Sequence, residues 1–587
     1  MFKNINYAKR GGEMMKKRES ILTKRILAGL MLGLLLGSSF YARPAAAGEV
    51  IAITADRTDD VKPNSSLTDN IVTVGTDGGG NSPSISSGNK DVYGGYAVGT
   101  ENAKNNKVFV KSGEMRYVNG GYSLSGVATD NKVYISGGEM DRVKGGYSSN
   151  GAVTDNTVTI GGGTINYYVN GGYSSNGAVT DNKVYINGGT MGDVYGGDSG
   201  TGVTTNNSVN ISGGMVKNNV YGGYSRSGTV TDNKVYISSG TINDSVYGGD
   251  SGTGAVTDNK VYIGGGTITR SVRGGYSDTS VTTNNSVDIS GGEMGYVYGG
   301  QGQLSATDNK VYISGGEMGY VYGGYSYNGA ATGNTVTISG GEMGYVYGGY
   351  SESGAVTGNT VTISGTPVFD ENRTVLYGGL SINGTVSGNT LNFNSKERTV
   401  SKVQNFDAYN FCLPGGTRAG NILLTMTAAN GADISGSKVQ VSAEGTAIAF
   451  KAGDHITLLY TDTPGTGSVI KADNMDYGKE MRQGVSVIYD VTTGLNEDGH
   501  KLVTTVNDGK VLEQTKSPVE TQAATAAFLN SGADMLAGSG IASMMAVTSA
   551  EDGAIFGAMG GGSMRYKTGS YADVKGYNLA LGIGKAV

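Results

Sequence analysis

Residues 131–155 read NKVYISGGEMDRVKGGYSSNGAVTD, and close variants of this segment recur from about residue 94 to residue 393. Successive copies are 24 to 26 residues apart, with a single step of 30 at the end. A period of this size is typical of a solenoid, in which each repeat stacks on its neighbours because it cannot bury its apolar face alone. The asparagine that opens the motif falls at Asn106, Asn131, Asn156, Asn182, Asn207, Asn233, Asn259, Asn285, Asn309, Asn334, Asn359 and Asn389.

The first five residues of each copy, Asn-x-Val-x-Ile, predict a strand. Side chains alternate along a strand, so the first, third and fifth positions share one face. That face carries Asn131, Val133 and Ile135 in the quoted copy, whereas the positions between them vary among copies and are mostly polar. β-Branched residues with a period of two favour a strand over a helix. We therefore expect the valine and isoleucine to face the core.

A second short strand is predicted beside the glycine pair, where Val118, Val143 and Val169 begin another apolar column. The Gly-Gly pairs supply corners with backbone angles that other residues adopt reluctantly, and such glycine density excludes a helical solenoid. The predicted fold is therefore all-β: a right-handed parallel β-helix of about twelve 25-residue rungs over residues 91–394, with rungs about 4.8 Å apart. Irregular capping rungs are expected in residues 48–90.

The asparagine column is expected to form an internal amide ladder, in which each side chain bonds to the rungs above and below. A ligand-binding role for the column is the alternative. The Val and Ile columns also decide against disorder, which 102 glycines in 587 residues would otherwise suggest.

Residue types needed for common catalytic and metal chemistry are scarce. The chain has one cysteine, Cys412, and two histidines, His455 and His500, all outside the repeats. A single cysteine cannot form an internal disulfide, and no Cys/His spacing indicates a zinc site. The sequence therefore predicts no cofactor and no bound metal.

The N-terminus predicts an export signal over residues 1–47. Basic residues from Lys16 to Arg25 precede an apolar run, 26–40, and the sequence Ala45-Ala46-Ala47 resembles a cleavage site. The apolar run is short for a membrane-spanning helix, although an uncleaved anchor is the alternative. Removal of 1–47 takes away nine Lys/Arg and two Asp/Glu and leaves 35 against 48, a net charge near −13. A chain this acidic is not expected to bind nucleic acid.

Two columns of tyrosines flank the Gly-Gly pairs. An exposed aromatic stripe could stack on sugar rings or anchor a protein partner, whereas the alternative is that tyrosines on adjacent rungs stack on one another. The first column includes Tyr93, Tyr195, Tyr221, Tyr247, Tyr298, Tyr322 and Tyr347. The second column, which we take as the candidate binding stripe, includes Tyr122, Tyr147, Tyr173, Tyr224, Tyr276, Tyr325 and Tyr350.

Repeated acids raise a calcium or glycosidase hypothesis. The calcium-binding nonapeptide pattern is absent, and a glycosidase needs two carboxylates in different environments. Copies of one acid in one repeated context do not meet that need, and no rung stands out by a unique cluster. We therefore expect a solvated surface and no catalytic residue. The acids are Glu114, Glu139, Glu293, Glu317 and Glu342, and Asp130, Asp155, Asp181, Asp232, Asp258 and Asp308.

The C-terminal third departs from the repeat. Residues 395–515 contain ordinary alternating β stretches and are predicted to form a β module that covers the open end of the solenoid. A linker helix is predicted in 516–549, because Ser517-Pro518-Val519-Glu520 combines a capping residue, a first-turn proline and a closing glutamate. In 550–587, Leu579, Leu581 and Ile583 alternate with small or polar residues, as in transmembrane β-barrels.

This order of parts resembles that of an autotransporter, a type V secretion protein of the Gram-negative outer membrane. The closest match lies in 556–566, FGAMGGGSMRY, and 573–577, DVKGY, which look like the opening two strands of the family's translocator barrel. The family's barrels use about twelve strands, whereas this sequence ends at Val587 after about two. The expectation is therefore an incomplete barrel, which belongs to an incomplete chain or a truncated gene product.

The resemblance implies export and display at the cell surface. The intact translocator would engage the outer membrane and its barrel-assembly machinery, and the passenger would act as a non-enzymatic adhesin toward host glycans or matrix proteins. Two alternatives stay open. One is a secreted β-helical carbohydrate-active enzyme, and the other is a truncated, non-functional autotransporter fragment.

Overall fold

The structure is a computed structural model that describes residues 48–54, 59–63, 67–75, 90–429, 431–445, 449–461, 470–547, 554–567 and 571–584. The chain divides into two units, Met1–Glu49 and Val50–Val587. The predicted signal peptide, 1–47, lies outside the described residues, so export stays a prediction.

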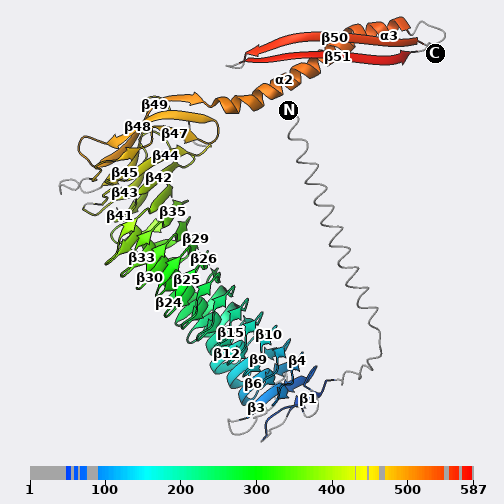
Figure 1. Ribbon diagram of the computed structural model, residues 1–587, viewed down its shortest axis with the longest axis vertical. Helices are drawn as coiled ribbons and strands as arrows, with labels where there is room; N and C mark the ends of the chain where they lie inside the picture. The colour runs from blue at the N-terminus through cyan, green and yellow to red at the C-terminus, as the bar shows by residue number, and fades with distance from the viewer. Residues whose placement is uncertain are drawn as a thin grey trace. The chain divides into compact units, whose positions relative to one another are not determined.

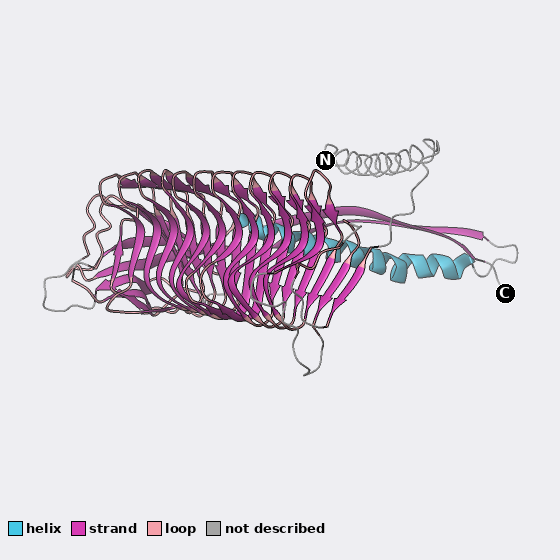
Figure 2. Cartoon of the chain, turned by 90° about the horizontal axis from the view of Figure 1, so that it is seen from below, coloured by secondary structure: helices cyan, strands magenta, loops and turns pink. Residues whose placement is uncertain are grey.

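Stacked parallel strands form a β-solenoid of about 14 turns, which confirms the predicted fold class (Figures 1 and 2). Neighbouring strands of the Asn-x-Val-x-Ile ladder pair in register, so that Val133 lies opposite Val158 and Ile135 opposite Ile160. This first ladder consists of β1 (Val50–Ile53), β2 (Ile71–Val74), β5 (Lys107–Val110), β8 (Lys132–Ile135), β11 (Thr157–Ile160), β14 (Lys183–Ile186), β17 (Ser208–Val216), β20 (Lys234–Ile242), β23 (Lys260–Ile263), β26 (Ser286–Ile289), β29 (Lys310–Ile313), β32 (Thr335–Ile338), β35 (Thr360–Ser364), β39 (Thr390–Asn394), β42 (Ala408–Leu413) and β44 (Lys438–Ala443).

Two further ladders complete each turn. The second ladder carries the Gly-Gly pairs and consists of β3 (Asp91–Ala97), β6 (Glu114–Ser123), β9 (Glu139–Ser148), β12 (Thr164–Ser174), β15 (Thr190–Ser199), β18 (Val220–Ser225), β21 (Ser245–Ser251), β24 (Thr267–Ser277), β27 (Glu293–Gly302), β30 (Glu317–Ser326), β33 (Glu342–Ser351), β37 (Val375–Ser381) and β41 (Lys402–Gln404). The third ladder consists of β4 (Ala103–Lys104), β7 (Ala128–Thr129), β10 (Val153–Thr154), β13 (Val179–Thr180), β16 (Thr204–Thr205), β19 (Val230–Thr231), β22 (Val256–Thr257), β25 (Val281–Thr283), β28 (Ser305–Thr307), β31 (Ala330–Thr332), β34 (Val356–Thr357) and β38 (Val386–Ser387).

The core lies between the ladders and is built from the predicted columns. The repeated valines and isoleucines of the first ladder are at most 2% exposed, and they pack against the valine and methionine or isoleucine columns of the second ladder. The intervening residues, such as Lys132 and Tyr134, stay partly exposed. The alternation inferred from the sequence is therefore the alternation of the structure.

The asparagine column forms the predicted amide ladder. Asn131 is representative: its Nδ2 donates to Asn156 Oδ1 at 2.9 Å and to the Ala103 carbonyl at 3.0 Å, and its backbone N–H donates to Asn156 Oδ1 at 3.0 Å. The ladder is one rung longer than the motif, because Asn70 donates to Asn106. It ends where the backbone N–H of Asn389 donates to a carboxylate oxygen of Asp407 at 3.0 Å.

The residue before each ladder asparagine occupies a left-handed corner. Asp130 has φ of 58°, and glycine takes the same place at Gly333, Gly358 and Gly388. Aspartate and asparagine adopt this conformation more readily than other non-glycine residues, because their short polar side chains bond locally. The repeated aspartates of Thr-Asp-Asn are thus corner residues, and they are exposed or half-buried as predicted.

Both ends of the solenoid are modified. At the N-terminal end, β1 pairs in register with β2, and β2 with β5, so 48–90 does contribute rungs. At the other end the first ladder continues past the predicted boundary at 394 through β42 and β44, with Tyr409 and Phe411 in its core. The remaining strands here are β36 (Val368–Phe369), β40 (Arg398–Val400), β43 (Ile422–Met426), β45 (His455–Thr461), β46 (Asp476–Tyr477), β47 (Glu480–Gln483), β48 (Val487–Leu495) and β49 (Lys501–Val511).

The stack is closed by a change of strand direction. β49 pairs antiparallel with β45 and with β48, and β48 pairs antiparallel with β47. The predicted module 395–515 is therefore two things: a continuation of the solenoid, followed by an antiparallel cap formed by β47, β48 and β49. A parallel rung cannot satisfy its own outer backbone groups, and the antiparallel strands pair with them.

The helical segment begins earlier than the sequence predicts. Helix α2 (Glu513–Met535) starts after Leu512, which makes no side-chain capping bond, so the helix predicted in 516–549 is present and begins three residues before its predicted bound. Glu, Gln and Lys are good helix formers, and they carry the helix back to Glu513 through Pro518. The π-helix η1 (Leu536–Gly540) and α3 (Ile541–Val547) continue it.

Strands β50 (Ala554–Lys567) and β51 (Tyr571–Gly584) form an antiparallel hairpin that contacts α2. Asn578 Nδ2 on β51 donates to Ser531 Oγ on α2 at 3.1 Å. The opposite face is apolar and open, since its large side chains are 65% to 80% exposed. These are Ile555, Met559, Leu579, Leu581 and Ile583. The predicted alternation of apolar and small or polar residues along 578–583 is confirmed.

Candidate functional site

The second ladder turns a corner at each Gly-Gly pair, and the residues on either side of the pair form two facing columns. We call these columns the tyrosine corner. The first column is Tyr93, Asn119, Lys144, Asn170, Tyr195, Tyr221, Tyr247, Arg273, Tyr298, Tyr322, Tyr347 and Tyr377, and the second is Tyr96, Tyr122, Tyr147, Tyr173, Asp198, Tyr224, Asp250, Tyr276, Gln301, Tyr325, Tyr350 and Leu380.

The amide ladder explains why the corner needs glycine. A Cβ placed on Gly197 would lie 2.5 Å from Cγ and Nδ2 of Asn207, which is closer than real side chains approach. The corner strand therefore passes directly over the asparagine ladder, and only glycine permits that approach. The motif that builds the interior thus also places the two aromatic columns opposite each other.

Tyrosines of the candidate binding stripe stack along the solenoid wherever neighbouring rungs both carry one. Ring centroids are 4.7 Å apart for Tyr122 and Tyr147, and 4.8 Å apart for Tyr325 and Tyr350. All seven stripe tyrosines are half-buried. Rings that stack on one another turn their faces inward along the column, so they offer mainly edges and hydroxyl groups to a ligand. For these pairs the stacking alternative is confirmed, and binding by the stripe stays a prediction.

Three residues interrupt the second column: Asp198, Asp250 and Gln301 replace tyrosine on their rungs. Lys144 and Arg273 interrupt the first column close to them. The expectation that no rung stands out needs correction at the rungs of Asp198 and Asp250, which carry a carboxyl group where most rungs carry a tyrosine. The signal was present in the sequence, where Gly-Gly-Asp-Ser replaces Gly-Gly-Tyr-Ser at 196–199 and 248–251.

Lys144 places its ammonium group between two rings of the second column. Its Nζ lies 4.4 Å from the ring centroid of Tyr147 and 4.4 Å from that of Tyr173. Burial lowers the pKa of Lys144 to about 8, and Asp198 opposes that shift. A cation over an aromatic face is stabilised by the ring quadrupole, so the corner itself accommodates an ammonium group.

Asp198 is bonded within the corner. Asn170 Nδ2 donates to Asp198 Oδ2 at 3.1 Å. Burial raises the pKa of Asp198 to about 7, and Lys144 and the Asn170 bond oppose that shift. Asp198 therefore has a bonding partner and a nearby cation.

Arg273 is held by the residues around Gln301. Its guanidinium carbon lies 5.1 Å, 5.4 Å and 5.1 Å from the rings of Tyr247, Tyr276 and Tyr298. Its Nε donates to Gln301 Oε1 at 2.6 Å, and Gln301 Nε2 donates to the Tyr327 hydroxyl at 2.8 Å. The guanidinium group of Arg273 is thus stabilised by three aromatic rings and by the side-chain amide of Gln301.

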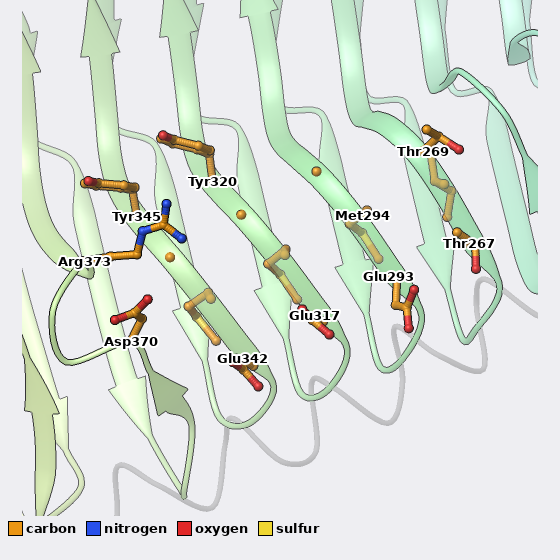
Figure 3. A pocket seen from close by; sticks show the side chains of 16 residues that line it. Thr267, Thr269, Glu293, Met294, Glu317, Tyr320, Glu342, Tyr345, Asp370 and Arg373 are labelled. Atoms are coloured by element: carbon orange, nitrogen blue, oxygen red, sulfur yellow. The ribbon is translucent and has the colours of Figure 1, made fainter.

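A separate groove of about 460 Å³ lies over the start of the second ladder (Figure 3). Tyr320 and Tyr345 line it and stack at 4.9 Å, beside the exposed carboxylates of the Gly-Glu-Met motif, and Tyr296 continues the stack from the neighbouring rung at 5.0 Å. Figure 3 shows Glu293, Glu317 and Glu342 following one another across three rungs, with Asp370 and Arg373 at one end. These glutamates are solvated, as predicted. In the part of the chain that the structure describes, no group of three or more His, Cys, Asp or Glu residues is placed to hold a metal ion.

No protein-family model matches this chain, and no curated protein matches it significantly. Among the described residues, no helix combines the length and the hydropathy needed to cross a membrane. The function must therefore be argued from the tyrosine corner, the groove and the helix with its hairpin.

Proposed function

We propose that this chain comprises the passenger and the first translocator segment of an autotransporter, and that the passenger is a non-enzymatic adhesin at the surface of a Gram-negative bacterium. The hairpin of β50 and β51 carries the proposal. Its open face exposes a row of large apolar side chains, while its other face packs on an alanine-rich helix. A strand pair with an apolar outer face and small inner residues suits lipid on one side and a pore with a slim helix on the other.

The order of parts supports the same proposal. A capped parallel solenoid precedes the helix and hairpin along the chain, so the repeats would be the displayed part. The partners on this reading are the outer membrane and the barrel-assembly machinery that inserts the intact translocator. A chain exposed outside the cell would meet host glycans and matrix proteins.

Adhesion fits the surface of the solenoid better than catalysis does. Stacked tyrosines give repeated edges and hydroxyl groups in the corner and in the groove. Such side chains combine apolar area with hydrogen bonding and are common at the centres of protein contacts. Repetition over many rungs lets one ligand chain bind at several places, which raises the overall affinity.

Binding assays on the purified chain test this function. The chain is applied to immobilised glycans and to wells coated with matrix proteins, and we expect saturable binding to at least one of them. Tyr320→Ser together with Tyr345→Ser should weaken binding in the groove, with Tyr185→Ser on the first ladder as the matched exposed control. Absence of binding to every glycan and every matrix protein would contradict the adhesin.

A second candidate function, polysaccharide hydrolysis, rests on Asp198 and Asp250. They lie two rungs apart, about 9.6 Å by rung spacing, which is near the separation of inverting carboxylate pairs. Burial raises the pKa of both carboxyls, to about 7 and about 8. In register, however, Tyr224 lies between the two carboxyl groups, where a sugar ring and the attacking water would have to bind, so we favour adhesion. Hydrolysis assays should stay blank; turnover that Asp198→Asn or Asp250→Asn abolishes would establish the enzyme instead.

A further inference from the structure

We propose that the gap between Tyr224 and Tyr276, with Asp250 at its base, is a binding slot for an alkylammonium group. The inference names a ligand class for the surface whose role is proposed above, and its biological meaning rests on that adhesin function. Cation binding by the slot can be tested on the purified chain alone. Failure of the slot to bind a cation therefore does not imply that the adhesin function is wrong, and failure of the adhesin function does not imply that the slot is empty of function.

The slot exists because a short side chain replaces a ring. Asp250 lies in register with Tyr224 on one neighbouring rung and with Tyr276 on the other. The two rings are therefore separated by two rung spacings, about 9.6 Å, instead of one. Each ring also meets a first-column tyrosine edge to face, Tyr224 with Tyr221 at 5.6 Å and Tyr276 with Tyr247 at 5.9 Å. Aromatic groups thus line the slot on several sides.

The carboxyl group at the base has no bonded partner. Asp250 is 7% exposed, and within the described part of the chain no hydrogen bond or ion pair reaches its side chain. Arg273 acts on Asp250 electrostatically, but it donates to Gln301, to the Tyr247 hydroxyl at 3.2 Å and to Ser271 Oγ. Burial of an ionised carboxylate without a partner is unfavourable, so a cation entering the slot would be stabilised by it.

The other two interruptions of the second column are satisfied internally. Asp198 accepts from Asn170, and Gln301 accepts from Arg273 and donates to Tyr327. All three positions break the same row of rings, yet of these three only Asp250 is left without a bonded group. This contrast separates a ligand slot from an ordinary irregularity of the repeat.

Lys144 supplies the internal precedent for the ligand. Its ammonium nitrogen lies 4.4 Å from each of two ring centroids in the same column. A cation midway between Tyr224 and Tyr276 would lie about 4.8 Å from each ring centroid, within the roughly 6 Å range of cation–π attraction. The slot offers the same two-ring geometry and adds a carboxyl group.

The charge of Asp250 makes binding pH-dependent. Burial raises the pKa of Asp250 to about 8, Asp278 adds to the rise, and Arg273 opposes it. The other titratable groups facing Asp250 are the hydroxyls of Tyr195, Tyr221, Tyr224, Tyr247 and Tyr276, whose pKa values are all raised. A cation prefers the ionised carboxylate, so its affinity should increase as the pH rises from 6 to 9.

Calorimetric titration with tetramethylammonium tests the slot, because this probe has no titratable proton. We expect saturable binding by the full chain. Asp250→Asn should weaken it about tenfold and remove its pH dependence. Asp250→Tyr should abolish it, since the new ring continues the tyrosine column and fills the slot. Asp288→Asn, which removes an exposed carboxylate on the first ladder, is the matched control and should bind as the wild type does.

Circular dichroism and thermal unfolding of each variant confirm that the solenoid is folded. Competition by choline and by Nα-acetyl-lysine N-methylamide then separates a quaternary head group from a lysine side chain as the source. Displacement of the probe by either compound supports the slot. No saturable binding by the wild type, or equal binding by the folded Asp250→Tyr variant, would overturn it.

Discussion

At the scale of single residues, each ladder asparagine serves both neighbouring rungs. Asn207 Oδ1 accepts from the backbone N–H and from Nδ2 of Asn182, at 3.0 Å and 2.9 Å. Its own Nδ2 donates to Asn233 Oδ1 and to the Val179 carbonyl. Because these groups are fully buried, no water can replace a lost partner. The asparagine side chain is therefore a structural requirement of each rung.

Replacement of one ladder asparagine should be strongly destabilising. Asn207→Ala removes the acceptor of the Asn182 backbone N–H and side-chain amide, and the donor to the Val179 carbonyl. Each buried group left unsatisfied costs about 1–3 kcal/mol. We expect a loss of about 3 kcal/mol or more in unfolding free energy, measured by guanidinium unfolding followed by circular dichroism. Asn210→Ala, on the outer face of the same strand, should change it by less than about 0.5 kcal/mol. Equal guanidinium unfolding midpoints for Asn207→Ala and Asn210→Ala would contradict a stabilising role for the asparagine ladder.

The buried carboxyl of Asp250 predicts how stability depends on pH. Its pKa is raised in the folded chain to about 8, so between pH 4 and 8 the folded state keeps a proton that the unfolded state releases. Unfolding becomes easier as the pH rises through this window. Asp250→Asn should therefore match the wild type near pH 4 and be more stable than it at pH 8. Thermal unfolding across this range checks the sign, and parallel curves for both proteins would refute it.

At the scale of elements, the antiparallel cap decides how the solenoid ends. β45 pairs parallel with β43 on one side and antiparallel with β49 on the other. Without β49, the last rung would present unpaired backbone groups, which favour pairing with another chain. The cap thus prevents a second chain from pairing with the last rung and extending the stack end to end.

Deletion of the cap should cause association. A chain lacking residues 480–511 exposes the edges of β44 and β45, and we expect oligomers in size-exclusion chromatography with light scattering. A chain lacking residues 554–584 keeps the cap and is the control for loss of an equally β-rich segment. If the cap-deleted chain stays monomeric while circular dichroism shows an intact solenoid, the prediction is wrong, because the exposed strand edges then do not pair with another chain.

At the scale of the whole molecule, the repeated part was predictable and its exceptions were not. Val133 and Ile135 recur with a fixed spacing, so the strand, its buried face and the asparagine ladder follow from the sequence. Asp250 breaks the Gly-Gly-Tyr-Ser pattern in the sequence, but only the strand register shows that it lies between two rings. The antiparallel cap was equally hidden, because strand direction depends on pairing between distant segments and leaves no periodic signal.

Surface display connects the solenoid to the hairpin and gives the last prediction. When the chain is expressed from its own gene, protease added to intact Gram-negative cells should digest the solenoid while a periplasmic marker survives. Leu581→Arg places a charge on the open face of β51, where contact with lipid would cost about 2–4 kcal/mol. It should lower the digested fraction, whereas Ala580→Ser on the face toward α2 should not. If the solenoid is digested only after the outer membrane is permeabilised, it lies inside the cell envelope and surface display is contradicted. If the Leu581→Arg and Ala580→Ser variants are digested equally, display does not depend on the open face of the hairpin.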